Sequence, residues 1–131
     1  MKKETTILIA DRNPHVREFL RRELSAAHYH VRLAESGKDL LCAIYKDPGI
    51  GLVILDPDFP DMDQHILLEK LQNRLPMLPV ILHTYLSDCE SMNLKDMYCV
   101  VGLIEKEGGS VEKLIVAVSD VLAGETGNTV P

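Results

Sequence analysis

The sequence predicts an α/β fold, a doubly wound five-stranded parallel sheet of (βα)5 type with helices on both faces. Five short runs rich in β-branched residues or leucine alternate with five longer segments of helical period, the pattern of such a sheet. Three runs are continuously apolar and are expected to be the central strands: Ile7-Leu8-Ile9, Leu52-Val53-Ile54-Leu55 and Val80-Ile81-Leu82. Right-handed crossovers leave few topologies, and 2-1-3-4-5 is the expected strand order.

The strands are predicted over residues 5–10, 30–34, 52–55, 80–83 and 100–105. The first helix opens at Asn13 and Pro14, because asparagine is a good N-cap and proline suits the first helical position. Ser36 is expected to cap a second helix over residues 38–46. A third helix ends before Pro76, since proline resists helical backbone.

The last two helices have their own start signals. Ser87 and Glu90 form a capping box for a fourth helix, and Ser110 is expected to cap the fifth. The fifth helix carries a strongly apolar stripe, composed of Leu114, Ile115, Val118, Val121 and Leu122. We expect one domain over residues 1–124 and a disordered tail over residues 125–131.

Composition points to a cytoplasmic protein without stabilising disulfides. The chain has 131 residues, of which 46% are apolar, enough for one ordinary domain with its own core. Cys42, Cys89 and Cys99 are widely spaced and are expected to be small buried hydrophobes in a reducing compartment. No apolar run approaches the ~20 residues that a membrane helix needs.

Charge argues against binding to nucleic acid or to a membrane surface. The formal net charge is −6, which disfavours non-specific attachment to either. Arg17, Arg21 and Arg22 form a basic cluster, but they stand at helical spacing among acidic residues. We interpret them as a solvated helix face.

Polar side chains follow four of the predicted strands. Asp11 follows the first, Asp56 and Asp58 the third, Thr84 the fourth and Lys106 the fifth. In an open parallel sheet, ligands bind beyond the carboxyl ends of the strands where the strand order reverses. A carboxylate flanked by a hydroxyl and an ammonium suits phosphoryl capture, with Asp56 as nucleophile and the other two as donors to phosphoryl oxygens.

With these residues in place, the sequence resembles the response-regulator receiver family over residues 6–123. The likeness is carried by residues 7–11, 53–63 and 79–84 and by Lys106. In order and spacing they are similar to the family's acidic pocket, phosphoacceptor strand, switch hydroxyl and active-site lysine. The resemblance implies the flavodoxin-like fold derived above and a signalling role in a two-component phosphorelay, not an enzymatic one.

The resemblance also implies partners and a cofactor. A histidine kinase or phosphotransfer protein would donate phosphate to Asp56, with a magnesium ion neutralising the charge. The candidate ligands of that ion are Asp11, Asp56 and Asp58, the last through its backbone carbonyl, with or without its side chain. Phosphorylation would reposition Thr84 and the surface formed by the fourth helix, the fifth strand and the fifth helix. A downstream protein would bind that surface.

Arg12 is the largest departure from the family pattern, because members usually carry a second acidic magnesium ligand there. Magnesium prefers several oxygen ligands in octahedral geometry, so its binding is expected to be weakened. The guanidinium could pair with Asp11 or Asp56 and stand in for the cation. It could also point to solvent.

Four further positions differ from the family. Glu107 replaces a proline, so the cis peptide bond that usually follows the lysine is not expected. Leu103 stands where a switch tyrosine or phenylalanine is common, and Tyr85 replaces a small residue and could shield the acceptor. Gln64 replaces a turn glycine. Together with Arg12, these differences predict a divergent receiver.

The histidines are too scattered to form metal-ligand spacing. They are His15, His28, His30, His65 and His83. His83 precedes Thr84 and is expected to be a packed residue at the end of a strand.

Three other functions compete with the receiver interpretation. A flavin carrier shares the topology, but residues 11–14 are not a hydroxyl- and glycine-rich loop and the chain has no tryptophan. A haloacid-dehalogenase-type phosphatase carries its aspartate pair after the first strand, whereas Asp56 and Asp58 follow the third. A phosphorylation-independent pseudo-receiver is favoured by Arg12 and opposed by Asp56, Thr84 and Lys106 together.

Overall fold

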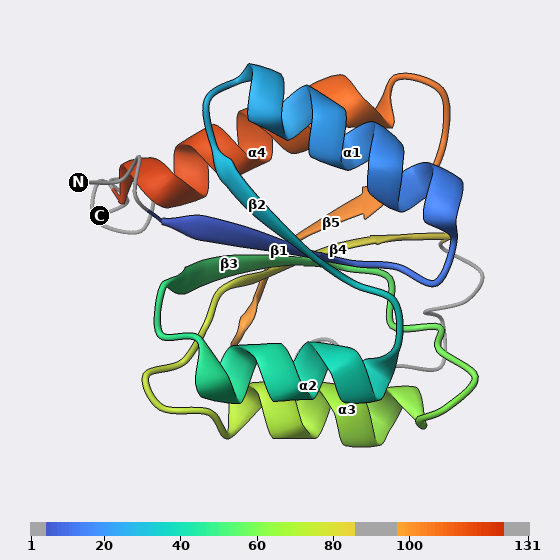
Figure 1. The fold of residues 1–131 in the computed structure, drawn as a ribbon, viewed down its shortest axis with the longest axis vertical. Coiled ribbons are helices and arrows are strands. Elements are labelled where there is room, and N and C mark those ends of the chain that lie inside the picture. Colours follow the sequence, from blue (N-terminus) through green and yellow to red (C-terminus); the bar gives the residue numbers. More distant parts are fainter. Residues whose placement is uncertain (1–4, 86–96, 125–131) are drawn as a thin grey trace.

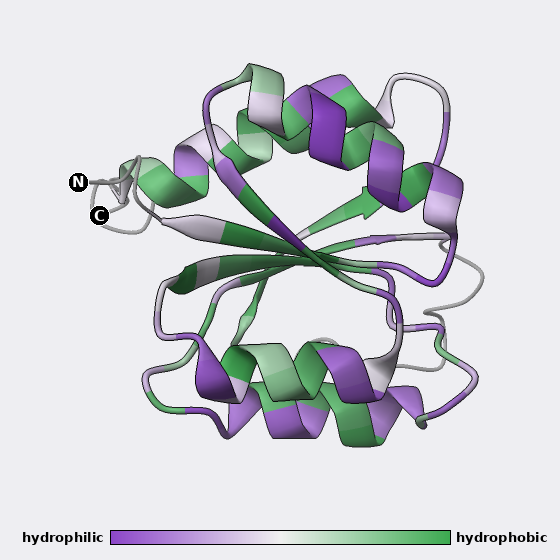
Figure 2. Ribbon diagram, viewed as in Figure 1, coloured by the Kyte–Doolittle hydropathy of each residue, from purple (hydrophilic) through white to green (hydrophobic). Residues whose placement is uncertain are grey.

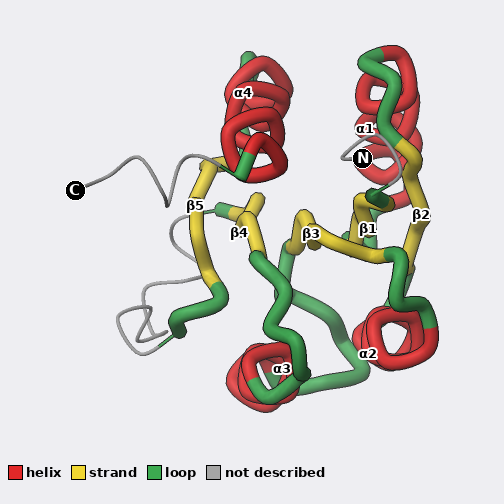
Figure 3. The backbone as a smooth tube through the Cα atoms, turned by 90° about the vertical axis from the view of Figure 1, so that its left-hand side faces the viewer, coloured by secondary structure: helices red, strands yellow, loops and turns green. Residues whose placement is uncertain are grey.

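The computed structural model describes residues 5–85 and 97–124. All strands of the five-stranded sheet run parallel, in the order β2-β1-β3-β4-β5. Helices α1 and α4 cover one face and α2 and α3 cover the other (Figures 1 and 3). The predicted strand order is therefore confirmed. The fourth helix of the predicted (βα)5 pattern, with its capping box at Ser87 and Glu90, and the tail at residues 125–131 lie outside the described residues.

The strand bounds agree with the apolar runs, with small extensions. They are β1 Thr6–Ala10, β2 His30–Ala34, β3 Ile50–Leu55, β4 Val80–Thr84 and β5 Val100–Glu105. The three runs expected to be central strands are β1, β3 and β4. This prediction is confirmed, because these strands lie between the edge strands β2 and β5. Because β4 reaches Thr84, this side chain is held by regular strand backbone, which fixes its direction.

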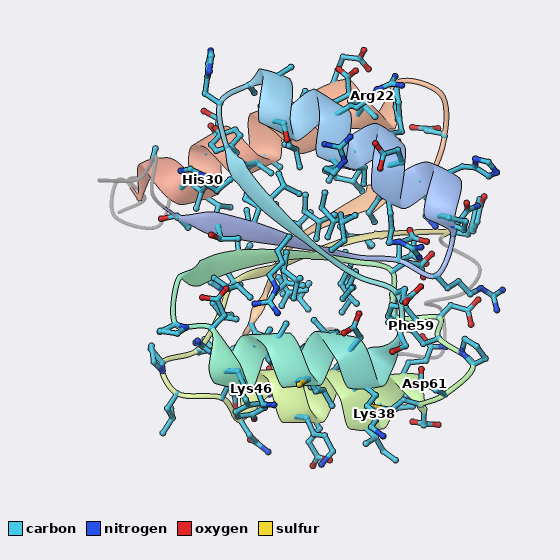
Figure 4. All side chains as sticks on the ribbon, in the orientation of Figure 1. Arg22, His30, Lys38, Lys46, Phe59 and Asp61 are labelled. Atoms are coloured by element: carbon cyan, nitrogen blue, oxygen red, sulfur yellow. The ribbon has the colours of Figure 1, made fainter. Side chains whose placement is uncertain are left out.

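Three of the four described helices, α1, α2 and α3, begin where a side chain accepts hydrogen bonds from free backbone N–H groups. The four helices are α1 Pro14–Ala26, α2 Gly37–Lys46, α3 Gln64–Gln72 and α4 Ser110–Ala123. Asn13 caps α1 and Ser36 caps α2 as predicted. The α2 start gains a second cap from a distant loop, since the Asp61 carboxylate accepts bonds from the N–H groups of Gly37 and Lys38, each at 3.0 Å. In Figure 4, Asp61 lies near Lys38.

Ser110 does not cap α4, so that prediction was wrong. The N-cap is Gly109, with φ of 86°, a left-handed conformation that glycine adopts without steric cost. The Ser110 hydroxyl instead lies 3.1 Å from Nε2 of His83. Because the Ser110 hydroxyl is bonded to His83, it does not accept a bond from the N–H groups at the start of α4.

The core consists of two apolar layers, one on each face of the sheet. Along β1, Leu8 packs toward the α2 and α3 side, and Ile7 and Ile9 pack toward the α1 and α4 side. This alternation follows from the two-residue period of a strand. Figure 2 shows the mostly hydrophobic central strands between helices in which hydrophobic and hydrophilic residues alternate.

The cysteines differ from one another. Cys99 is buried as expected, but Cys42 on α2 is exposed, because the apolar side of α2 is formed by Leu40, Ala43 and Ile44. The expectation of burial was therefore wrong for Cys42, and Cys89 lies outside the described residues. Within residues 5–85 and 97–124, no helix combines the length and apolar character that crossing a membrane requires.

His83 is packed at the end of β4, as the sequence predicted. It is buried, and its Nδ1 has no hydrogen-bond partner. Burial, reinforced by the nearby Lys106 charge, lowers the pKa of His83 to about 4. The imidazole is therefore neutral in the folded protein at physiological pH.

This buried neutral histidine predicts a pH-dependent loss of stability. The folded pKa of about 4 lies below the unfolded value of 6.5, so between these values the unfolded chain binds more protons. The stability that this group contributes is then fully present above pH 6.5 and is lost as the pH drops toward 4, and it amounts to on the order of 3 kcal/mol. Urea unfolding of the wild type and of His83→Gln at several pH values measures it. A pH slope that is equal in the two proteins would contradict the assignment.

Candidate functional site

Two buried carboxylates lie side by side at the carboxyl ends of β1 and β3. Asp11 directly follows β1, and its N–H donates to the carbonyl of Ala34 at 3.2 Å. Asp56 directly follows β3, and its N–H donates to the carbonyl of Ala10 at 3.0 Å. Both residues therefore continue the sheet ladder by one bond. This regular backbone places both carboxylates, each almost completely buried, at the same end of the sheet.

Lys106 bridges the two carboxylates. Its Nζ lies 2.8 Å from Oδ2 of Asp11 and 2.6 Å from Oδ2 of Asp56. The Lys106 N–H donates to the carbonyl of Thr84 at 3.0 Å, so the backbone pairing of β4 with β5 extends to the lysine. Among the described residues, the cis peptide bond is Leu75–Pro76, and the bond from Lys106 to Glu107 is not cis, as expected. The backbone hydrogen bond from Lys106 to Thr84 therefore positions the lysine in the absence of a cis peptide bond after it.

Thr84 completes the contacts of Asp56. Its hydroxyl donates to Oδ1 of Asp56 at 3.1 Å, and the N–H of Asp58 donates to the same oxygen at 3.1 Å. Thr84 is fully buried. The structure thus brings together the carboxylate, hydroxyl and ammonium that follow three different strands.

Burial and ion pairing shift the pKa values of Asp11 and Lys106 in opposite directions. Burial raises the pKa of Asp11, and the bond to Lys106 offsets this only in part. Burial alone would lower the pKa of Lys106, but its bonds to Asp11 and Asp56 outweigh the desolvation and raise it. The lysine is therefore a permanent cation at physiological pH.

Arg12 takes neither of its two expected positions. Its Nη2 lies 3.4 Å from Oδ2 of Asp58, and both side chains are about half exposed, at 56% and 45%. The carboxyl groups of Asp11 and Asp56 are already occupied by Lys106 and by backbone donors. The guanidinium therefore pairs with the remaining carboxylate, at the rim of the pocket.

Tyr85, Leu103 and Gln64 take different positions around the pocket. The Tyr85 ring centroid lies 5.5 Å from Nζ of Lys106, within cation–π range, while the side chain remains half exposed. Leu103 lies on β5 and is partly exposed. Gln64 is the first residue of α3, and its buried Oε1 has no hydrogen-bond partner. Tyr85 is thus the one of these three that contacts a residue of the site.

Two supporting residues were missed by sequence reasoning. The N–H of Asn13 donates to Oδ1 of Asp11 at 2.9 Å, and Nη1 of Arg17 donates to the Asp11 carbonyl at 2.7 Å. The Arg17 side chain is only 14% exposed, so its assignment to a solvated face was wrong. Its position one turn into α1, behind the Asp11 loop, was the available signal. Arg21 does lie at the surface, paired with Glu18.

An apolar cleft of about 690 Å³ adjoins the lysine. It lies between the start of α1 and the start of α4, and its lining includes His15, Phe19, Tyr85, Lys106 and Gly109. Lys106 is the residue of the site that lines this cleft, and Asp11, Asp56 and Asp58 do not line it.

The residues that could hold magnesium are Asp11, Asp56 and Asp58, and their surroundings do not fit a tight divalent site. Every carboxylate oxygen of Asp11 and Asp56 already accepts a bond from this chain. The Asp58 carboxylate is paired with Arg12. Among the described residues, no group of three or more His, Cys, Asp or Glu side chains could hold a metal ion.

Curated relatives of this chain are transcriptional regulators. It is 37% identical over 82 residues to the C4-dicarboxylate transport transcriptional regulatory protein DctD of Pseudomonas aeruginosa, covering 62% of this chain and 17% of that protein. It is 36% identical over 84 residues to the DNA-binding transcriptional regulator NtrC of Klebsiella pneumoniae, covering 63% of this chain and 18% of that protein. The chain thus spans less than a fifth of the length of these relatives.

Solved structures share the fold. A response regulator, TrrA from Thermotoga maritima, in complex with Mg2+-BeF, matches with a TM-score of 0.77 and 24% identity, over 88% of this chain and 97% of that one. The chemotaxis response regulator CheY4 of Vibrio cholerae matches with a TM-score of 0.74 and 19% identity, over 87% and 98%. The sequence model of a protein family, the response regulator receiver domain, matches residues 7–118 of this chain. The chain therefore belongs to the response regulator receiver domain family.

Proposed function

We propose that the chain is a phosphorylated receiver, which takes a phosphoryl group onto Asp56 from a histidine kinase or a phosphotransfer protein. The observation that carries this proposal is the convergence of Lys106 and Thr84 on the two oxygens of the Asp56 carboxylate. An ammonium and a hydroxyl in these positions can donate to phosphoryl oxygens once the group is bound to the carboxylate. In this proposal the chain is a cytoplasmic signalling module and not an enzyme.

The transfer itself is a nucleophilic displacement at phosphorus. A carboxylate oxygen of Asp56 forms a bond to the phosphorus of a phosphohistidine, and the bond from phosphorus to the imidazole nitrogen breaks. The imidazole leaves with the electron pair and takes up a proton from solvent. Lys106 reduces the repulsion between the carboxylate and the incoming phosphoryl group, because its charge lies 2.6 Å from the acceptor. The cleft beside Lys106 provides the approach for the donor.

Phosphorylation is proposed to change the surface formed by β5 and α4. Thr84 is bonded to Asp56 through its side chain and to Lys106 through its carbonyl. In the phosphorylated protein, the Thr84 hydroxyl would move to donate to a phosphoryl oxygen. The end of β5 next to Thr84 would then move with it. Leu103 on that strand is partly exposed. A downstream protein would bind there, at α4 and at the helix predicted near Ser87. Direct contact with nucleic acid is not part of this role, as the net charge of −6 indicates.

Phosphorylation of Asp56 is tested by intact-mass measurement after incubation with acetyl phosphate. The wild type is expected to gain one phosphoryl mass, and Asp56→Asn none, because the amide is not a nucleophile. Asp47→Asn changes an exposed carboxylate paired with Arg32 and should be modified like the wild type. An unmodified wild type, with and without magnesium, would favour a phosphorylation-independent interaction module instead.

The role of the Thr84 hydroxyl is tested by substitution with an isosteric apolar residue. Thr84→Val should still gain the phosphoryl mass, because Asp56 and Lys106 remain. The amide NMR shifts that phosphorylation causes in β5 and at the start of α4 should shrink by at least about half, since a donor worth ~1 kcal/mol is lost. Thr84→Ser keeps the hydroxyl and should respond like the wild type. Shift changes of equal size in Thr84→Val would refute a switch at this residue.

A further inference from the structure

Arg12 is a cation at the rim of the pocket, and it pairs with Asp58 and not with the acceptor Asp56. Arg12 directly follows Asp11 in the chain, and it pairs with Asp58 at 3.4 Å. Asp58 in turn donates its N–H to Oδ1 of Asp56. Arg12 is therefore linked to the acceptor carboxylate through Asp58. Lys106 approaches the other oxygen of that carboxylate.

The charges of the pocket are close to balance without a metal ion. Three carboxylates, those of Asp11, Asp56 and Asp58, face the two cations Lys106 and Arg12, so the formal charge is −1. An acidic residue at position 12 would make it −3. A divalent ion entering the present pocket would also have to displace the donors that each oxygen of Asp11 and Asp56 already has. The demand for a divalent cation is therefore low.

We propose that Arg12 acts as the second cation for the phosphoryl group on Asp56, so that Asp56 is phosphorylated without a divalent metal ion. This inference rests on the proposed function, since it concerns the same acceptor. Lys106 would bind phosphoryl oxygens from the β5 side, and Arg12 would bind them from the rim.

The geometry favours such a transfer of Arg12 from Asp58 to the phosphoryl group. The Arg12–Asp58 pair is half exposed and long, and pairs of this kind contribute roughly 0–1 kcal/mol. A phosphoryl group brings close to two negative charges and three acceptor oxygens. A guanidinium can bind such a group with two parallel bonds, whereas the Arg12 contact with Asp58 is a long one at 3.4 Å. Releasing Asp58 therefore costs less than the new contact provides.

Acetyl phosphate is the donor with which the step can be followed. A carboxylate oxygen of Asp56 forms the bond to phosphorus, and the bond from phosphorus to the acetyl oxygen breaks. Acetate leaves with the electron pair and needs no proton at neutral pH. The products are aspartyl phosphate and acetate, and no further reactant is required.

The test compares phosphorylation rates in EDTA and in magnesium chloride, followed by intact mass. The wild type should react at rates that agree within about threefold in the two conditions. Arg12→Asp should lose at least ~10-fold in EDTA and recover in magnesium, as expected for a site whose metal affinity depends on a neighbouring residue. Arg21→Ala removes an equal charge from an exposed pair on α1 and should match the wild type.

Magnesium binding gives a second measurement that does not depend on phosphorylation. Calorimetric titration with magnesium chloride should show at least ~10-fold tighter binding to Arg12→Asp than to the wild type. Arg12→Gln keeps a similar length without charge and should show an intermediate affinity, which serves if the aspartate variant does not fold. Equal affinities in the wild type and the folded variants would overturn the role of Arg12.

The outcomes separate this inference from the function on which it rests. A wild type that is phosphorylated only with magnesium would overturn the metal-independent step and leave Asp56 as the acceptor. A wild type that is modified in neither condition would overturn both. Modification in both conditions, with a selective loss in Arg12→Asp, supports both.

Discussion

The ammonium of Lys106 holds the carboxyl end of the sheet together. Asp11 and Asp56 are buried next to each other, and two carboxylates in such a place repel one another and lose hydration. The lysine contacts both at 2.8 and 2.6 Å, so one positive charge lies within hydrogen-bond distance of both carboxylates. The same lysine continues the pairing of β5 with β4. The site and the edge of the sheet are thus stabilised by one residue.

The supporting contacts come from backbone as much as from side chains. Asp11 is fixed through its carbonyl by Arg17 and through its carboxylate by the N–H of Asn13. Asn13 is also the residue that caps α1. The loop after β1 is therefore ordered by the helix that follows it. Asp11 is therefore held in place beside the acceptor Asp56 before any charged group binds.

Arg12 shows how one substitution alters the chemistry open to a common fold. The fold depends on apolar strands and capped helices, none of which involves position 12. The pocket, in contrast, changes its formal charge by two when an acid is replaced by arginine. In our proposal, this chain retains the sheet, the acceptor and the lysine while its dependence on metal ions changes.

The sequence by itself determined the strand order, the central strands, the starts of α1 and α2 and the meeting of Asp11, Asp56, Thr84 and Lys106. Apolar runs, cap residues and parallel strand ends are local or topological signals, and they do not depend on side-chain detail. Only the tertiary structure decided the partner of Arg12, the burial of Arg17, the exposure of Cys42 and the bond between His83 and Ser110. Each of these depends on which groups from distant elements compete for the same donor, acceptor or surface. The order of residues along the chain does not show which of these groups will be neighbours, so it cannot predict the outcome of that competition.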